Sequence, residues 1–548
     1  MENRLLLAFV LSLLVFFGWG YLISKIQGPP PDKPETAQKK AEPKTFLPAP
    51  DLPSGQAVLP PVSGEEHAAP VPGFRQPEVQ FPGEEITVKV SNGRVTFLIS
   101  NKGGVLKGIL LAKYKDAKGD PIDLVHMNGG RVFPLALEAD DEWVTRILQN
   151  AKYTVSADSL VLSPADPEKT LTMRLQHESG LVVVRKFTFH YDKYLFDVQT
   201  QITGTPFAGK NLSYNVLWGP GLGGAVTSQT DYIVFSGPTT FVNNERIETP
   251  PEDIEGQVRQ RGEVMWTGFQ NKYFAAALVP EKGTKSAVVK KDGEDVFVGL
   301  ELESVQSSAF VSHKVYAGTK ELMVLEEAGN QLVRLIDYGW VGNKFAFLVK
   351  PLLKSLQYFY GLIHNYGWSI IIITVIIKII FFPLTHKSFK SMKGMQKVQP
   401  YVKIIQERHK DDRQKMNEEM LELYKKHKVN PLGGCLPMLL QIPVFIALYH
   451  ALFFSIELKG APFIGWITDL SVADPYYVTP VLMGASMYLQ QKLSPAVGDP
   501  MQQKIMMMLP IFFTFLFMSF PAGLVLYWTV NNILTISQQY YIYNFTKD

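Results

Sequence analysis

A lysine, Lys378, stands near the middle of the apolar stretch Trp368–His386. The stretch has about 20 residues, enough for a helix to cross a bilayer at roughly 1.5 Å rise per residue. An ammonium group at that depth costs about 2.5–3.5 kcal/mol, so it normally faces a bundle interior or a wet cavity, where it can attract a carboxylate. Alternatively, the flexible stem carries the charge to the nearer lipid headgroups. Position alone leaves both interpretations open.

Other polar side chains also stand inside apolar stretches, at a depth similar to that of Lys378. They are Thr374, Gln441, Gln490, Thr529, Asn531, Asn532, Thr535, Ser537 and Gln538. Such groups can be simple hydrogen-bonding contacts between helices, worth about 0.6 kcal/mol each. Their shared depth with a lysine favours instead a water-containing recess, open to one side and sealed on the other by the aliphatic segment Ile370–Ile373. We keep both alternatives.

Patterns that would support catalysis or metal binding are weak. Gly219, Gly221 and Gly224 match G-x-G-x-x-G, but Pro220 interrupts the loop and no helical pattern follows, which argues against a nucleotide site. The histidines are widely spaced, and the single cysteine, Cys435, excludes both a disulfide framework and a cysteine metal site. No Ser-His or paired-Asp constellation supports an intramembrane hydrolase. We therefore expect a protein that is not an enzyme, with no catalytic residues, cofactor or metal.

The polar residues described above must be positioned by membrane helices. Six apolar stretches are candidate spans: Leu5–Ile23, Trp368–His386, Leu436–Ile456, Tyr477–Leu493, Ile505–Phe520 and Gly523–Tyr541. The segment between the second and third spans holds 12 Lys and Arg against 6 Asp and Glu, which favours a cytoplasmic position. Alternation then places both termini in the cytoplasm and the long region between the first two spans on the opposite side.

The first 82 residues predict an anchor and a tether. Residues 1–27 contain the first span and lack an A-x-A-like cleavage site, so we expect an uncleaved transmembrane anchor. Residues 28–82 hold 14 prolines and few aliphatic side chains, which predicts a disordered or partly polyproline tether.

Residues 83–335 switch to the alternating pattern of strands. Three hairpins are predicted, with turns at Asn92-Gly93 and Asp192-Lys193 and within the segment Ser236–Glu248. Helical periodicity is nearly absent before Leu322–Ile336. The pattern predicts a large antiparallel β-sandwich, with a cleft for a peptide or glycan as an open alternative.

The rest of the chain predicts helices. Residues 336–366 contain an amphipathic helix suited to the membrane interface, and residues 367–386 contain the second span. Residues 387–430 predict a cytoplasmic helical hairpin that Pro400 divides into two pieces, about Lys387–Gln399 and Tyr401–His427. Residues 431–543 contain the last four spans, and residues 544–548 form a cytoplasmic tail.

Several segments carry a family resemblance. HNYGWSIIIITVIIKIIFFPLT, KVNPLGGCLPMLLQIPVFIALYHAL and FPAGLVLYWTVNN closely resemble YidC-type membrane protein insertases of the YidC/Oxa/Alb superfamily. The resemblance runs continuously over about Asp337–Tyr543, and the anchor, tether and β-domain resemble the Gram-negative form. It implies a multi-pass inner-membrane protein with six transmembrane helices, five of them forming the insertase core, and a periplasmic β-supersandwich.

The resemblance also implies a site and partners. A hydrophilic groove open to the cytoplasm would be lined by Lys378, Thr374, Gln441, Gln490, Tyr527, Trp528 and Asn532. Most relatives have arginine at the Lys378 position, and lysine lacks the planar fork that binds carboxylates. Such a protein inserts and helps to fold nascent membrane proteins, alone or with the Sec translocon. The ribosome would bind at the cytoplasmic side, and nucleic acid would not be bound directly.

A transporter or channel that uses Lys378 as a counter-charge is the competing class. It would need a pathway open to both sides of the membrane, and the aliphatic half of the second span argues against one.

Overall fold

The computed structural model describes most of the chain from residue 83 onward. The described residues are 83–116, 118–125, 132–204, 213–224, 234–302, 304–305, 308–409, 412–427, 429, 436–493 and 500–545. The predicted anchor and tether lie outside them, as do Cys435 and the last three residues.

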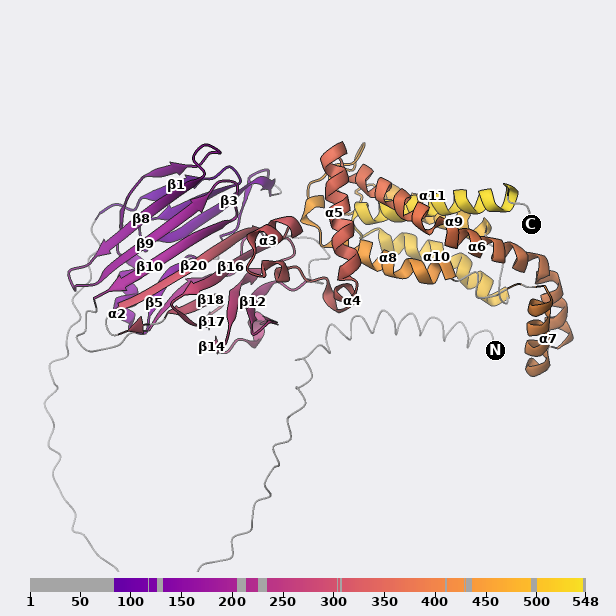
Figure 1. Ribbon diagram of the computed structural model, residues 1–548, viewed down its shortest axis with the longest axis horizontal. Coiled ribbons are helices and arrows are strands. Elements are labelled where there is room, and N and C mark those ends of the chain that lie inside the picture. Colours follow the sequence, from indigo (N-terminus) through magenta and orange to yellow (C-terminus); the bar gives the residue numbers. More distant parts are fainter. Residues whose placement is uncertain are drawn as a thin grey trace, which may run out of the picture. The chain divides into compact units, whose positions relative to one another are not determined.

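Three sheets make up the first described part (Figure 1). The largest has, in spatial order, β13 (Glu245–Glu248), β12 (Gly237–Val242), β15 (Val264–Gln270), β16 (Phe274–Lys282), β20 (Ser308–Thr319), β10 (Leu195–Thr203), β9 (Val182–His190), β8 (Glu168–Gln176) and β6 (Thr154–Val155), with β19 (Ser304–Val305) beside β20. The second has β4 (Pro121–Asp123), β3 (Val105–Lys115), β2 (Val95–Ser100), β1 (Thr87–Ser91) and β7 (Ser159–Val161). The third has β14 (Gln257–Gln260), β17 (Thr284–Asp292), β18 (Asp295–Leu302), β11 (Tyr214–Trp218) and β5 (Ala136–Ala139).

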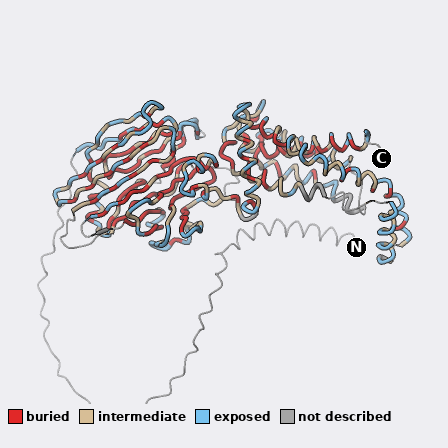
Figure 2. Tube along the Cα trace, in the orientation of Figure 1, coloured by how far each residue is buried: buried red, intermediate tan, exposed pale blue. Residues whose placement is uncertain are grey.

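The two smaller sheets pack against the large one. Phe97 of β2 contacts Phe189 of β9 and Phe196 of β10, each with ring centroids 5.0 Å apart. The third sheet contacts β15, β16 and β20 through β18. Buried residues run along the strands in Figure 2, and burial alternates along β9 and β10 as expected for strands with one face in a core. The predicted sandwich is confirmed, apart from one parallel pair, β1 with β7.

All three predicted hairpins are present. β1 pairs with β2, β9 with β10 and β12 with β13, each in antiparallel register. The third turns at Asn243 and Asn244, whose φ angles are 51° and 62°. A two-residue hairpin turn of type I′ needs two residues with positive φ, and asparagine tolerates this conformation better than most.

One helix in this part was not predicted. Helix α2 (Glu142–Asn150) begins after Asp141, whose carboxylate accepts hydrogen bonds from the Trp143 and Val144 amides at 3.0 and 3.1 Å. Farther on, α3 (Leu322–Ala328) and the 3-10 helix η3 (Leu332–Leu335) fall where helical spacing was predicted. A further 3-10 turn, η2 (Pro251–Asp253), connects β13 to β14.

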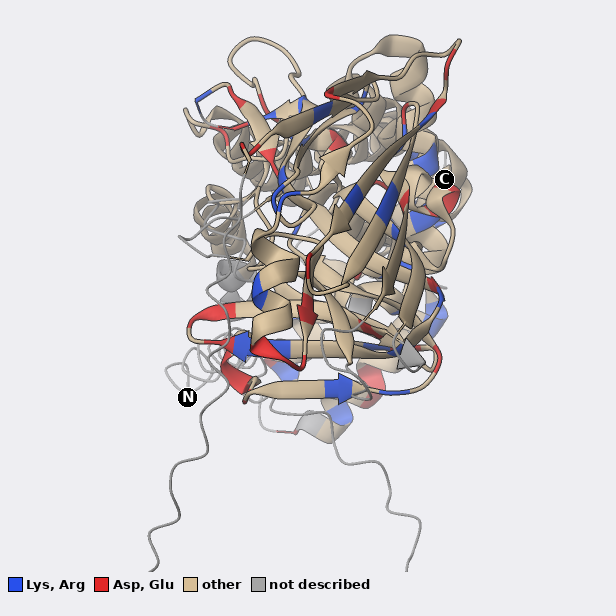
Figure 3. Ribbon diagram, turned by 90° about the vertical axis from the view of Figure 1, so that its left-hand side faces the viewer, with Lys and Arg blue, Asp and Glu red and all other residues tan. Residues whose placement is uncertain are grey.

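Charges of both signs are interspersed over this part (Figure 3). The net charge of the chain is only +3, in agreement with that distribution. Neither the distribution nor the net charge indicates a polyanionic partner.

The second described part is helical. Its elements are α4 (Gly339–Lys344), α5 (Ala346–Ile363), α6 (Tyr366–Arg408), α7 (Arg413–Lys426), α8 (Leu436–Phe453), the 3-10 helix η5 (Ile456–Leu458), α9 (Val478–Leu493), α10 (Pro500–Phe517) and α11 (Ala522–Phe545). Helix α11 contacts α6, α8 and α9, while α9 also contacts α10, and α5 contacts α6 and α8.

Among the described residues, one helix, α6, is long and apolar enough to cross a membrane by length and composition. The segments Gln441–Phe453 and Met506–Phe517 are shorter apolar helices. A single such helix is weak support for a membrane protein by itself. The six-span arrangement therefore stays a prediction.

The predicted break at Pro400 is wrong. Helix α6 continues through Pro383 and Pro400 to Arg408, and α7 begins at Arg413. There the side chain of Asp412 caps α7 by accepting from the Lys415 amide at 3.1 Å. A proline removes one backbone hydrogen bond from a helix, which kinks it without always ending it.

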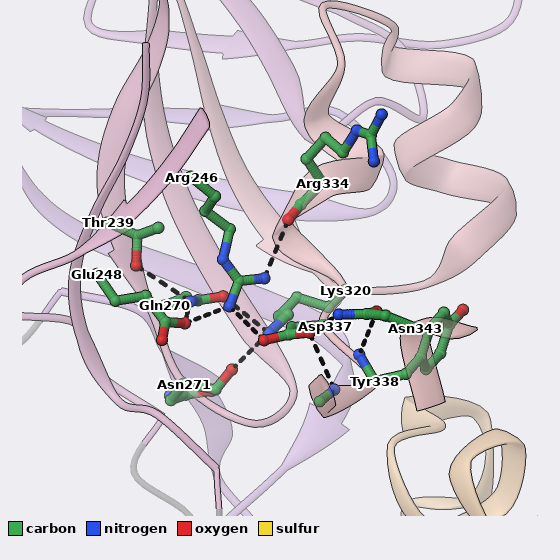
Figure 4. A network of polar contacts seen from close by, with 11 residues as sticks. Thr239, Arg246, Glu248, Gln270, Asn271, Lys320, Arg334, Asp337, Tyr338 and Asn343 are labelled. Carbon is green, nitrogen blue, oxygen red and sulfur yellow. Dashed lines mark hydrogen bonds and ion pairs between the residues drawn. The ribbon is translucent and has the colours of Figure 1, made fainter. Parts of the chain in front are cut away.

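A polar network joins the β-domain to α4, the first helix of the second described part (Figure 4). The Arg246 guanidinium of β13 pairs with Glu248 and lies 2.7 Å from the Asp337 carboxylate, which also accepts from the Gly339 amide and the Asn343 side chain. Burial raises the pKa of Asp337, but Arg246 and these hydrogen bonds outweigh it, so the pKa falls below its usual value. The carboxylate is thus ionised and ties α4 to the sheet.

Lys320 lies in the same network. Its ammonium donates to the Gln270 side chain at 3.0 Å and to the Asn271 carbonyl at 3.1 Å. Burial lowers the pKa of Lys320 to about 7, because the charged form loses its hydration.

We expect Arg246→Ala to loosen the start of α4, because the half-buried carboxylate of Asp337 loses its cation. Losing a hydrogen bond to a charged group costs about 2 kcal/mol, so amides of residues 334–345 should exchange with deuterium roughly 30-fold faster in the full-length protein. The control is Arg174→Ala, which removes an exposed arginine from β8. Unchanged exchange at residues 334–345 in the Arg246→Ala protein would contradict the role given to the network.

Candidate functional site

Lys378 is held by the last helix. Its ammonium donates to the Thr535 hydroxyl of α11 at 2.7 Å, and that hydroxyl donates in turn to the Asn531 carbonyl at 2.7 Å. Lys378 remains partly exposed, and among the described residues no carboxylate is paired with it. Its neighbours Ile379 and Ile380 are exposed, as expected for a face in contact with lipid. The site therefore holds a partly exposed lysine that is hydrogen-bonded to a hydroxyl and paired with no carboxylate of the described residues.

Three more polar pairs connect α11 to its neighbours. The Gln441 side chain of α8 donates to Asn531 at 2.6 Å, and Asn532 donates to Ser486 of α9 at 3.0 Å. Gln538 donates to Thr385 of α6 at 2.5 Å. Together with the lysine pair they form what we call the polar seam: Lys378, Thr385, Gln441, Ser486, Asn531, Asn532, Thr535 and Gln538.

The predicted site residues divide into two groups. Lys378, Gln441 and Asn532 belong to the polar seam, and the Tyr527 hydroxyl hydrogen-bonds with the Gln441 side chain. Tyr527 is otherwise buried in the core of the helices.

Thr374, Trp528 and Gln490 lie outside the seam. The Thr374 hydroxyl donates to the Ile370 carbonyl of its own helix at 2.6 Å. The Trp528 indole packs against Phe445 and Phe517, with ring centroids 4.6 and 5.1 Å apart. Gln490 is partly exposed in the last turns of α9. Trp528 thus contributes packing among aromatic rings.

Two seam residues, Ser486 and Thr385, were not predicted. Ser486 lies in a segment of small residues, Gly484-Ala485-Ser486, and Thr385 lies at the end of the second apolar stretch. A hydroxyl in an apolar helix can satisfy itself on the preceding turn, so its residue type gives no sign that it bonds another helix. The available signal was the asparagine and glutamine side chains on the neighbouring helix, because an amide side chain needs a partner outside its own helix.

The geometry supports the alternative of interhelical contacts. Each of the four pairs lies between two different helices, and the distances are those of good hydrogen bonds. A water-containing recess stays a proposal. The two interpretations are compatible, because Lys378 is partly exposed even though its ammonium is hydrogen-bonded to Thr535.

The Asn532–Ser486 pair should be energetically coupled. A double-mutant cycle with Asn532→Ala and Ser486→Ala should give a coupling of about 0.5–1.5 kcal/mol in the unfolding free energy of the detergent-solubilised protein. Ser537, whose hydroxyl donates to Ile533 of its own helix, is the control: Ser537→Ala should not couple to Asn532→Ala. A zero coupling at Asn532–Ser486 would show that the contact contributes nothing to helix association.

Comparison with known proteins identifies the family. The family described as 60Kd inner membrane protein matches residues 358–548, and the YidC periplasmic domain family matches residues 87–355. The membrane protein insertase YidC of Geobacter metallireducens is 41% identical over 99% of this chain and 98% of its own length. The corresponding proteins of Geobacter sulfurreducens and Magnetococcus marinus are 40% and 37% identical, each over 99% of this chain and 98% of their own length. This chain therefore belongs to the YidC family of membrane protein insertases.

Proposed function

We propose that this inner-membrane protein inserts nascent membrane proteins by drawing their polar tails toward the polar seam. The observation that carries this proposal is Lys378, a partly exposed residue whose ammonium donates to the Thr535 hydroxyl at 2.7 Å and has no paired carboxylate among the described residues. An uncompensated cation at membrane depth attracts an acidic or polar group. The tail of an entering chain supplies such a group.

The energetics of insertion follow from this arrangement. A tail that reaches Lys378 has crossed part of the bilayer beside polar groups instead of hydrocarbon. The length of hydrocarbon that the tail must still cross is therefore shorter, and the free-energy cost of translocation is lower. The apolar helix behind the tail then moves into lipid, driven by about 25 cal/mol per Å² of apolar surface removed from water. The protein supplies positioning and charge, and no bond is made or broken.

The partners follow from the placement of charge. With the basic segment of α6 and α7 in the cytoplasm, the hairpin would meet chains as they leave the ribosome, and the β-domain would lie in the periplasm. Insertion alone and insertion beside the Sec translocon are both consistent with a site that opens sideways to lipid. We place both termini in the cytoplasm and assign six spans, with residues 1–27 as the first.

Charge variants of Lys378 test the proposal. Lys378→Arg should retain insertion because guanidinium keeps the charge, whereas Lys378→Ala should slow substrates with acidic tails roughly tenfold more than matched substrates with neutral tails. Lys387→Ala, nine residues farther along α6 at an exposed position, is the control and should affect neither. Insertion of a matched substrate pair into vesicles gives the measurement. Equal rates for both substrates with Lys378→Ala would make the lysine a mere anchor.

The orientation can be tested separately by labelling single cysteines in a Cys435→Ser background. The Glu178→Cys protein, changed at an exposed residue of the β-domain, should react with a membrane-impermeant maleimide in intact spheroplasts. The Lys403→Cys protein, changed at an exposed residue of α6, should react only after permeabilisation. The reverse pattern would place the β-domain in the cytoplasm and remove the basis of the proposed path.

A further inference from the structure

A cavity of about 360 Å³ opens where the β-domain meets the ends of the membrane helices. It is lined by the end of β3, the end of α5, the start of α6 and the segment that follows α8. Cavities of this size accommodate small ligands, for which about 300–1,000 Å³ is typical. This cavity is separate from the polar seam, and the proposed insertion path does not use it.

Both signs of charge line the cavity. Lys113 and Lys115 come from β3 and Lys459 from the segment after α8, while Glu457 and Asp469 come from that same segment. None of the three lysines forms an ion pair with a carboxylate of the described residues. Two of them lie over aromatic rings: the ammonium groups of Lys113 and Lys459 are 5.5 and 5.3 Å from tyrosine ring centroids. The cations are therefore available to a phosphate.

The carboxylates are fixed in place by their own hydrogen bonds. Glu457 is 7% exposed and accepts from the Gln357 side chain of α5 and from Ser455, both at 2.6 Å. Asp469 accepts from the Ser471 amide and hydroxyl at 2.8 and 2.7 Å. A site for a purely anionic ligand would not keep two carboxylates in its wall, because they would repel it.

An aromatic wall completes the cavity. The rings of Tyr360 and Tyr366 are stacked, with centroids 3.9 Å apart and an interplanar angle of 6°. Aromatic faces attract ammonium groups, so this wall and the two carboxylates favour a cation on one side of the cavity while the lysines favour an anion on the other.

The surroundings point to lipid. On α5, next to the cavity, Tyr358 and Leu362 are 65% and 64% exposed. The segment between α8 and α9 exposes Ile464, Trp466 and Tyr476. Trp and Tyr gather at the level of the lipid headgroups, with apolar side chains directed toward the acyl chains. A headgroup in the cavity would leave its chains beside these side chains.

We propose that this cavity binds the zwitterionic headgroup of a phospholipid, a phosphodiester joined to a primary ammonium as in phosphatidylethanolamine. The phosphate lies among Lys113, Lys115 and Lys459, and the ammonium lies toward Asp469, Glu457 and the stacked tyrosines. The bound lipid bridges β3 and the helix ends, so it supports the joint between the β-domain and the membrane helices.

Lipid retention by the full-length protein tests this proposal. The protein is placed in nanodiscs of phosphatidylcholine that contain a small fraction of phosphatidylethanolamine or phosphatidylglycerol, and the lipid that stays bound is counted by native mass spectrometry. We expect the ethanolamine lipid to be retained, and Lys115→Gln and Asp469→Asn each to lower its retention roughly tenfold. Lys118→Gln is the matched control, since it removes an exposed lysine three residues beyond Lys115 that does not line the cavity.

Competition distinguishes a lipid from a free phosphate compound. Soluble glycerophosphoethanolamine should displace the lipid only at high concentration, because it lacks the acyl chains that contact α5. Displacement by glycerophosphoethanolamine at concentrations equal to those of the lipid would overturn the lipid as the occupant. Preferential retention of phosphatidylglycerol would overturn the zwitterionic assignment. Equal retention by the wild type and by both cavity variants would overturn the site, whatever the outcome for insertion at Lys378.

Discussion

A polar atom between membrane helices has no water to bond with, so it must find its partner in the protein. In this chain that constraint is met largely by one helix, α11, which supplies Asn531, Asn532, Thr535 and Gln538 to partners on α6, α8 and α9. The apolar packing around them, including the rings that surround Trp528, carries no such directionality. The seam therefore constrains how the helices are rotated about their axes, and it holds the Lys378 ammonium against α11.

The joint between the β-domain and the helices follows a second rule, that buried charges need partners. Arg246 meets Asp337, and Lys320 meets neutral oxygen acceptors. The ammonium of Lys272 lies 4.2 Å from the ring centroid of Phe453, at the end of α8. These contacts join sheet and helix through several independent interactions, so the start of α4 and the end of α8 are tied to one surface of the domain.

Much of the fold could be predicted because its signals are local. Asn243-Asn244 between alternating strands specifies a hairpin turn, and long, mainly apolar stretches indicated the helices α8 to α11. Helix α2 was missed because nine residues are too few to outweigh the strand pattern around them, although Asp141 was a usable cap signal. Lys378 and Gln441 could be chosen from their depth in apolar stretches. Their partners Thr535 and Asn531 could not be assigned, because pairing depends on how helices distant in sequence face each other.

The length of α6 has a mechanical consequence. Its 43 residues span roughly 65 Å, about twice the thickness of the hydrocarbon core, so the helix reaches well beyond it toward α7. Pro383 and Pro400 each remove a backbone hydrogen bond and act as joints in an otherwise stiff rod. We therefore expect a force applied at the hairpin to bend α6 at these two prolines first, before it displaces Lys378. Bending there would let the hairpin change direction while the Lys378 ammonium keeps its contact with the Thr535 hydroxyl.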